Sequence, residues 1–157
     1  MDDGRSPSIT PERALLTARI IWGALLMGQL IFLVVVLSIG PRFTEPHADV
    51  SRILFYAAAA MLATLVPVAY VLRGVIYSKG RKDGVVAPEA YLTGNILFLA
   101  LCEAVGMAGL AFGLLNRGTG PNIVIAIAAI AVQAINFPTG RAMRDDEAVR
   151  PMHRRPS

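Results

Sequence analysis

Glu103 is the residue of this sequence with the clearest potential for chemistry inside a membrane. It lies in the segment Ala100-Leu101-Cys102-Glu103-Ala104-Val105-Gly106, in the middle of an apolar run from Ala90 to Asn116 that contains no other charged residue. A charged side chain at the centre of a bilayer costs roughly 2.5–3.5 kcal/mol on insertion scales, so such residues commonly serve a function. Glu103 is therefore a candidate site for binding a proton or a cation.

Three other polar side chains are expected at the same depth as Glu103. Gln29, Thr64 and Gln133 each lie within about four residues, or about 6 Å, of the middle of their own apolar runs. Polar side chains within lipid bond with one another, at about 0.6–2 kcal/mol for each contact. We therefore predict a carboxyl–amide cluster of Glu103, Gln29, Thr64 and Gln133, with Gln133 as the preferred partner of Glu103.

Two interpretations of this cluster remain open at the level of sequence. In the functional one, Glu103 takes up and releases a proton or binds a cation. In the structural one, a neutral glutamic acid forms hydrogen bonds with Gln29 or Gln133 and fixes the register of the helices. The variant Glu103→Gln separates the two interpretations, because glutamine can still form hydrogen bonds but cannot release a proton.

No other combination of residues in the chain suggests catalysis or ligand binding. Cys102 is the single cysteine, and the two histidines, His47 and His153, are isolated from other ligating residues. The sequence contains no Ser/His/Asp or Cys/His set, no metal-spaced cluster and no glycine loop of the kind that holds phosphate. We therefore expect a non-enzymatic protein with no catalytic residues, no cofactor and no metal site.

The elements that position these residues are four long apolar runs. The chain has 157 residues, of which 55% are hydrophobic, a share too high for a soluble domain. The runs lack the two-residue alternation of barrel strands, so they indicate helices. We predict a single all-α transmembrane domain, an antiparallel four-helix bundle of two hairpins, with spans at about 14–39, 53–76, 90–115 and 121–137 and a cytoplasmic tail at 138–157.

Local signals predict where two of the helices begin and where one bends. Thr10-Pro11-Glu12 combines a capping residue, a proline suited to the first helical position and an acid suited to the positive end of a helix. Pro88-Glu89 repeats this signal before the third run. Pro67 lies inside the second run and is expected to bend that helix.

Small residues on the third and fourth runs predict close helix packing. Such residues let two backbones approach, and polar residues on the same face hydrogen-bond across the contact. On the fourth run, Asn122, Ala126, Ala129, Gln133 and Asn136 follow steps of 4, 3, 4 and 3 residues along one helical face. The helix-packing residues predicted from both runs are Ala100, Gly106, Gly109, Gly113, Ala126 and Ala129.

The distribution of lysine and arginine predicts the orientation of the bundle. Twelve of these residues lie in the N-terminal segment, the second connection and the C-terminal tail, and three lie in the other two connections. Because positive residues are retained on the cytoplasmic side, we predict a multi-pass protein of the inner (plasma) membrane with both termini in the cytoplasm. The basic residues alternate with apolar spans and form no stripe, so we expect lipid and not nucleic acid as their partner.

One part of the chain resembles a known membrane hairpin. Residues 53–115 contain a small-residue helix (Ala57 to Ala63), the basic loop Arg81-Lys82-Asp83 and a second helix with a mid-span carboxylate, Glu103. This order is similar to that of the c subunit of the rotary ATP synthase, and the resemblance implies that Glu103 carries protons. The chain departs from the c subunit in having alanines in place of its glycine repeat, a longer loop without Arg-Gln-Pro, and two additional spans.

The chain as a whole also resembles small four-span bacterial membrane proteins of unknown function. The resemblance includes the exit segment Phe137-Pro138-Thr139 after the last span, and it implies fold and location without an activity. The function that we expect is that of a non-enzymatic accessory or assembly protein, whose small-residue faces contact another membrane protein or a second copy. The alternative is a proton- or cation-handling protein that uses Glu103.

Overall fold

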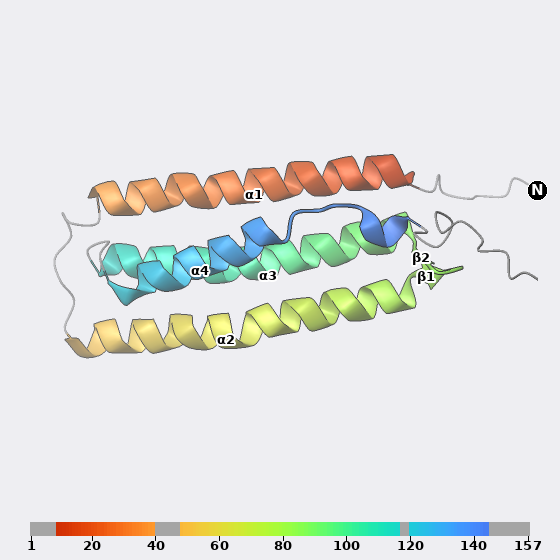
Figure 1. Cartoon of the computed structure of the whole chain (residues 1–157). Helices are drawn as coiled ribbons and strands as arrows, with labels where there is room; N and C mark the ends of the chain where they lie inside the picture. The colour runs from red at the N-terminus through yellow and green to blue at the C-terminus, as the bar shows by residue number, and fades with distance from the viewer. Residues whose placement is uncertain (1–8, 40–47, 117–119, 145–157) are drawn as a thin grey trace, which may run out of the picture.

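The computed structural model describes residues 9–39, 48–116 and 120–144, and within these ranges four helices form a bundle (Figure 1). The helices are α1 (Pro11–Ile39), α2 (Ala48–Lys79), α3 (Pro88–Leu115) and α4 (Pro121–Ile135), and a short 3-10 helix, η2 (Arg141–Met143), follows α4. The prediction of an all-α bundle is confirmed.

The predicted helix starts are confirmed. α1 begins at Pro11, where the backbone N–H of Arg13 donates to Oγ1 of Thr10 over 3.4 Å, and α3 begins at Pro88. α2 continues through Pro67 without interruption.

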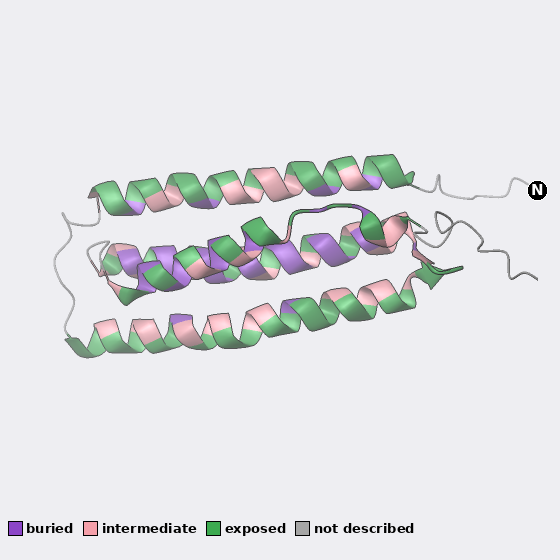
Figure 2. Ribbon diagram, in the orientation of Figure 1, coloured by how far each residue is buried: buried purple, intermediate pink, exposed green. Residues whose placement is uncertain are grey.

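α3 is the helix on which the other three pack. α3 and α4 lie between α1 and α2 (Figure 1), and the buried residues are concentrated on α3 and α4 (Figure 2). The close approach of α4 depends on glycines of α3. A Cβ atom on Gly109 would lie 3.0 Å from the backbone nitrogen of Ala126, and one on Gly113 would overlap the side chain of Ile123.

A small β-hairpin connects α2 to α3. Its strands, β1 (Arg81–Lys82) and β2 (Val85–Val86), pair antiparallel, with Arg81 opposite Val86. The two loop residues, Asp83 and Gly84, have φ angles of 49° and 87°, as a two-residue type I′ turn requires. The sequence predicted a basic, turn-rich connection but no strands, because each strand has only two residues. The tight turn makes α2 and α3 antiparallel neighbours.

The lengths of the helices indicate a membrane protein. α1, α2 and α3 are long and apolar enough to cross a bilayer. α4 has 15 residues, or about 22 Å of helix, against a hydrocarbon thickness of about 30 Å. The fourth run was predicted to extend to residue 137, but the helix ends at Ile135 and residues 137–140 are not helical.

The segment after α4 continues along the bundle in the direction of α4 and reaches the end where the β-hairpin lies, as the blue trace between α4 and η2 in Figure 1 shows. Pro138 and Gly140 are buried, so the predicted cytoplasmic tail begins inside the protein. Residues 145–157 of that tail lie outside the described residues, as does His47.

Candidate binding site at the end of α4

Two of the four polar residues predicted to converge do so. Nε2 of Gln29 in α1 donates to Oε1 of Gln133 in α4 over 2.8 Å, and both side chains are fully buried. Gly106 of α3 makes room for this pair, because a Cβ atom at that position would lie 2.6 Å from Oε1 of Gln29. The centre of the bundle therefore contains an amide pair.

Glu103 and Thr64 lie outside the amide pair. Thr64 is exposed, and its hydroxyl donates to the carbonyl of Ala60 in the same helix over 2.7 Å. Glu103 is half-buried and forms no hydrogen bond with another described residue. The predicted four-residue cluster rested on depth along each helix, and depth does not specify the face on which a residue lies. The role of Glu103 as a proton or cation site stays a prediction.

Most of the small residues predicted for helix packing are used inside the chain. Gly106, Gly109 and Gly113 are buried against α1 and α4, and Ala126 and Ala129 are fully buried. Ala100 is exposed. These residues therefore join the helices of one bundle, and only Ala100 remains on the surface.

The end of α4 is stabilised by side chains from all three neighbouring helices. Nε1 of Trp22 donates to the carbonyl of Gln133 over 2.8 Å, and Nε of Arg19 donates to the carbonyl of Pro138 over 3.2 Å. The backbone N–H of Gly140 donates to the hydroxyl of Tyr91 over 3.0 Å. An unpartnered backbone group costs several kcal/mol in lipid, and these contacts give partners to the carbonyls of Gln133 and Pro138 and to the N–H of Gly140.

Asn136, the first residue after α4, connects this helix end to α2. Its Nδ2 donates to the carbonyl of Val132 over 2.8 Å and to the hydroxyl of Tyr70 over 2.6 Å. Its Oδ1 accepts a hydrogen bond of 3.2 Å from the guanidinium of Arg73. One side chain therefore caps α4 and orients an arginine of α2.

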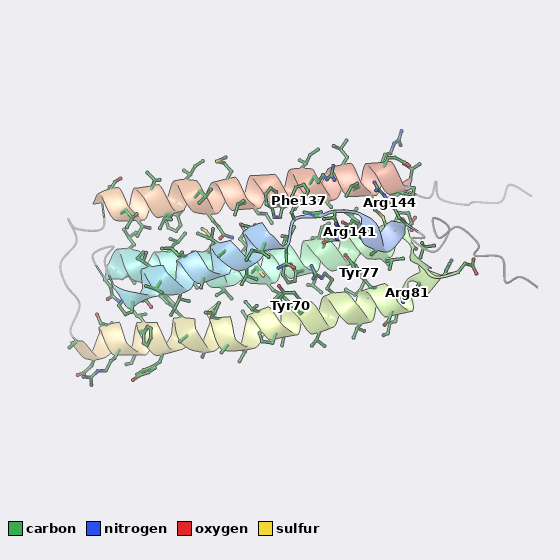
Figure 3. All side chains as sticks on the ribbon, viewed as in Figure 1. Tyr70, Tyr77, Arg81, Phe137, Arg141 and Arg144 are labelled. Carbon is green, nitrogen blue, oxygen red and sulfur yellow. The ribbon has the colours of Figure 1, made fainter. Side chains whose placement is uncertain are left out.

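A pocket of about 470 Å³ lies beside this helix end, between α2, α3 and the segment after α4. The pocket exists because α4 stops short and leaves the last turns of α2 without a neighbour on that side. Figure 3 shows Tyr70 and Tyr77 along the inner side of α2 and Arg141 on the segment after α4. The pocket is lined by Tyr70, Arg73, Gly74, Tyr77, Tyr91, Asn95, Ile135, Asn136, Phe137, Pro138, Thr139, Arg141 and Ala142.

Arg73 is held in place by two aromatic rings. Its guanidinium carbon lies 4.4 Å from the ring centroid of Phe98 and 5.2 Å from that of Tyr70. Cation–π contacts of this kind contribute about 0.5–2 kcal/mol each. Among the described residues, the only hydrogen bond of the guanidinium is the one from Nη2 to Asn136, which leaves its other N–H donors for a ligand.

The three tyrosines of the pocket accept hydrogen bonds from groups that can only donate. Tyr77 accepts from Nδ2 of Asn95 over 2.6 Å, and this nitrogen also donates to a backbone carbonyl. Tyr91 accepts from the N–H of Gly140, and Tyr70 accepts from Asn136. None of the three hydroxyls donates to another described residue, so each keeps its own hydrogen for a ligand.

The pocket is positively charged. Arg73 and Arg141 line it, and no acidic residue does. Among the described residues, no group of three or more histidine, cysteine, aspartate or glutamate side chains could hold a metal ion. The arrangement is chemically suited to binding an acceptor-rich, negatively charged group.

Comparison with known proteins gives no assignment: no protein-family model, curated protein or solved structure matches the chain. The resemblances noted from the sequence therefore remain expectations.

Sequence reasoning missed this pocket, although two signals point to it. The fourth apolar run has 17 residues, about 25 Å as a helix, which is too short to cross the hydrocarbon core. Three of the four tyrosines of the chain, Tyr70, Tyr77 and Tyr91, flank the basic second connection. The hydrogen bonds of Trp22 and Arg19 to the end of α4 have no signal in the sequence, because they join residues more than 100 positions apart.

The amide pair leads to a prediction about stability. Gln29→Leu or Gln133→Leu alone leaves a buried amide without its partner, whereas the double variant removes both. We expect a coupling free energy of about 0.6–2 kcal/mol between the two positions, measured by reversible unfolding in detergent micelles. As a control, the same cycle between Glu103→Leu and Gln133→Leu is expected to show no coupling. A Glu103–Gln133 coupling as large as the Gln29–Gln133 coupling would contradict the described geometry.

Proposed function

We propose that this chain is a non-enzymatic membrane accessory protein that acts by binding another molecule at the pocket beside the end of α4. The observation that supports this proposal most strongly is the pocket itself, which combines two arginines and three tyrosine hydroxyls on three separate segments of the chain. A binding role needs such a recess, whereas catalysis would need a nucleophile or a base beside it.

The use of the small-residue faces within the bundle supports a pocket-based role over helix docking. Gly109 and Gly113 contact α4, and Gly106 contacts Gln29. The small-residue faces of α3 and α4 that were expected to contact another membrane protein are thereby occupied, whereas Ala57, Ala60 and Ala63 of α2 are exposed. A contact with another membrane protein or a second copy remains a prediction, as does the orientation with both termini in the cytoplasm.

Blocking the pocket tests the binding role. Gly74 lines the pocket and is exposed, and a Cβ atom added to it would have no other atom within 4 Å. Gly74→Trp is therefore expected to fill the pocket without a backbone clash. We expect native mass spectrometry of the wild-type protein, extracted with its surrounding lipid, to show a bound small molecule whose mass does not change on incubation. Gly74→Trp is expected to lose most of this adduct.

The matched control for the blocking variant is Ala60→Trp, an equally large change at an exposed position of α2 away from the pocket. This control is expected to keep the adduct. If Gly74→Trp and Ala60→Trp retain the adduct equally, the pocket is not the binding site. If the wild-type protein converts the adduct into a product, the non-enzymatic proposal fails.

The second candidate function is proton or cation handling at Glu103. The observation that favours it is that the half-buried carboxyl of Glu103 has no hydrogen-bond partner among the described residues. The buried amide pair of Gln29 and Gln133 does not include it.

Liposome measurements separate this candidate from the binding role. We expect wild-type and Glu103→Gln proteins, reconstituted at equal density, to give the same proton flux as empty liposomes. Proton flux above that of empty liposomes, abolished by Glu103→Gln, would establish ion handling and displace the binding proposal.

A further inference from the structure

The pocket offers several hydrogen-bond donors to a ligand. Asn136 fixes one edge of the Arg73 guanidinium over 3.2 Å, and the other N–H groups of Arg73 have no partner among the described residues. The hydroxyls of Tyr70, Tyr77 and Tyr91 already accept hydrogen bonds, so what remains to each is its O–H. Planar guanidinium edges and hydroxyl donors match the several acceptor oxygens of a phosphate group.

The charge of the pocket favours one class of phosphate-bearing molecule over another. Arg73 and Arg141 both line it, and none of its lining residues is acidic. A zwitterionic headgroup carries an ammonium group next to its phosphate, and this ammonium group would find no carboxylate here. The pocket therefore favours a headgroup whose net charge is negative.

The depth and the walls of the pocket indicate a lipid as the carrier of that phosphate. Arg73 lies ten positions beyond Ala63, which is near the middle of α2, or about 15 Å along the helix axis. Half of a hydrocarbon core is also about 15 Å, so the backbone of Arg73 is expected at the boundary between hydrocarbon and headgroups, with its guanidinium, which bonds Asn136, just inside that boundary. Ile135, which is 82% exposed, and Phe137 line the same pocket and give it an apolar wall.

We infer that this pocket binds the headgroup of an anionic phospholipid, with its phosphate contacted by Arg73 and Arg141 and its acyl chains against Ile135 and Phe137. This inference rests on the proposed binding role and specifies the ligand. The tyrosine hydroxyls donate to the phosphate oxygens, and the amides of Asn95 and Asn136 hold these hydroxyls in place.

The test measures lipid selectivity of the full chain in nanodiscs. The lipid is phosphatidylcholine with either phosphatidylglycerol or phosphatidylethanolamine as the minor component. The salt concentration is about 0.5 M, because salt at this level screens the long-range attraction of anionic lipid to the basic surface. We expect lipids retained by the protein in native mass spectrometry to favour phosphatidylglycerol. Arg141→Gln, a change at an exposed residue, is expected to reduce this preference about fivefold to tenfold.

Three further variants complete the test. Arg73→Gln is expected to have the same effect as Arg141→Gln; because Arg73 also bonds Asn136, its fold is checked by thermal unfolding. Tyr77→Phe removes only one hydroxyl and is expected to reduce the preference about two- to fivefold. Lys82→Gln removes one exposed positive charge at the same end of the bundle, outside the pocket, and is expected to change the preference less than twofold.

The outcomes are distinct. Equal retention of the two minor lipids by the wild-type protein, or an effect of Lys82→Gln as large as that of Arg141→Gln, would overturn the inference. Displacement of phosphatidylglycerol by millimolar glycerol 3-phosphate would assign the pocket to a soluble phosphate and would also overturn it. If lipid selectivity is absent but Gly74→Trp still loses an adduct that Ala60→Trp keeps, the proposed binding role holds and only the lipid inference fails.

Discussion

The rest of the structure depends on the contacts that stabilise the end of α4. α4 ends at Ile135, where a membrane-spanning helix would continue for several more residues. The side chains of Trp22 and Asn136 bond carbonyls in the last turn of α4, and those of Arg19 and Tyr91 bond backbone groups of the segment after it. Lipid offers no hydrogen bonds, so these residues supply the partners that backbone groups need in a bilayer core. They also join the end of α4 to α1, α2 and α3.

The same helix end links structure to function. A full-length α4 would cover the last turns of α2, and the pocket would not form. Asn136 contributes both to the end of the helix and to the pocket, since it bonds a carbonyl of α4 and also holds Arg73 and Tyr70. In transporters, interrupted helices at membrane depth commonly mark binding sites, because irregular backbone is tolerated there only where it lines a cavity. The pocket of this chain fits that general rule.

Sequence patterns predicted the fold more fully than the site. Apolar run lengths and the Pro11 and Pro88 signals specify the four helices and two of their starts, because these features are local. Depth alignment placed Gln29 and Gln133 in one cluster, with Glu103 as the preferred partner of Gln133, and in the structure the two glutamines bond each other. It could not specify rotation about each helix axis, so Glu103 and Thr64 were assigned to a cluster that they do not join. The pocket depends on contacts between distant residues such as Trp22 and Gln133, for which a single sequence carries no signal.

The most direct test of the interrupted helix is the backbone conformation of residues 136–140 in a lipid bilayer. Solid-state NMR gives the ¹³Cα and ¹³Cβ chemical shifts of labelled Phe137, Pro138 and Thr139. We expect non-helical shifts for these three residues and helical shifts for Ile130 and Gln133, which belong to α4. Helical shifts that continue through Phe137 and Thr139 would show an α4 that crosses the bilayer, and would contradict both the interrupted helix and the pocket beside it.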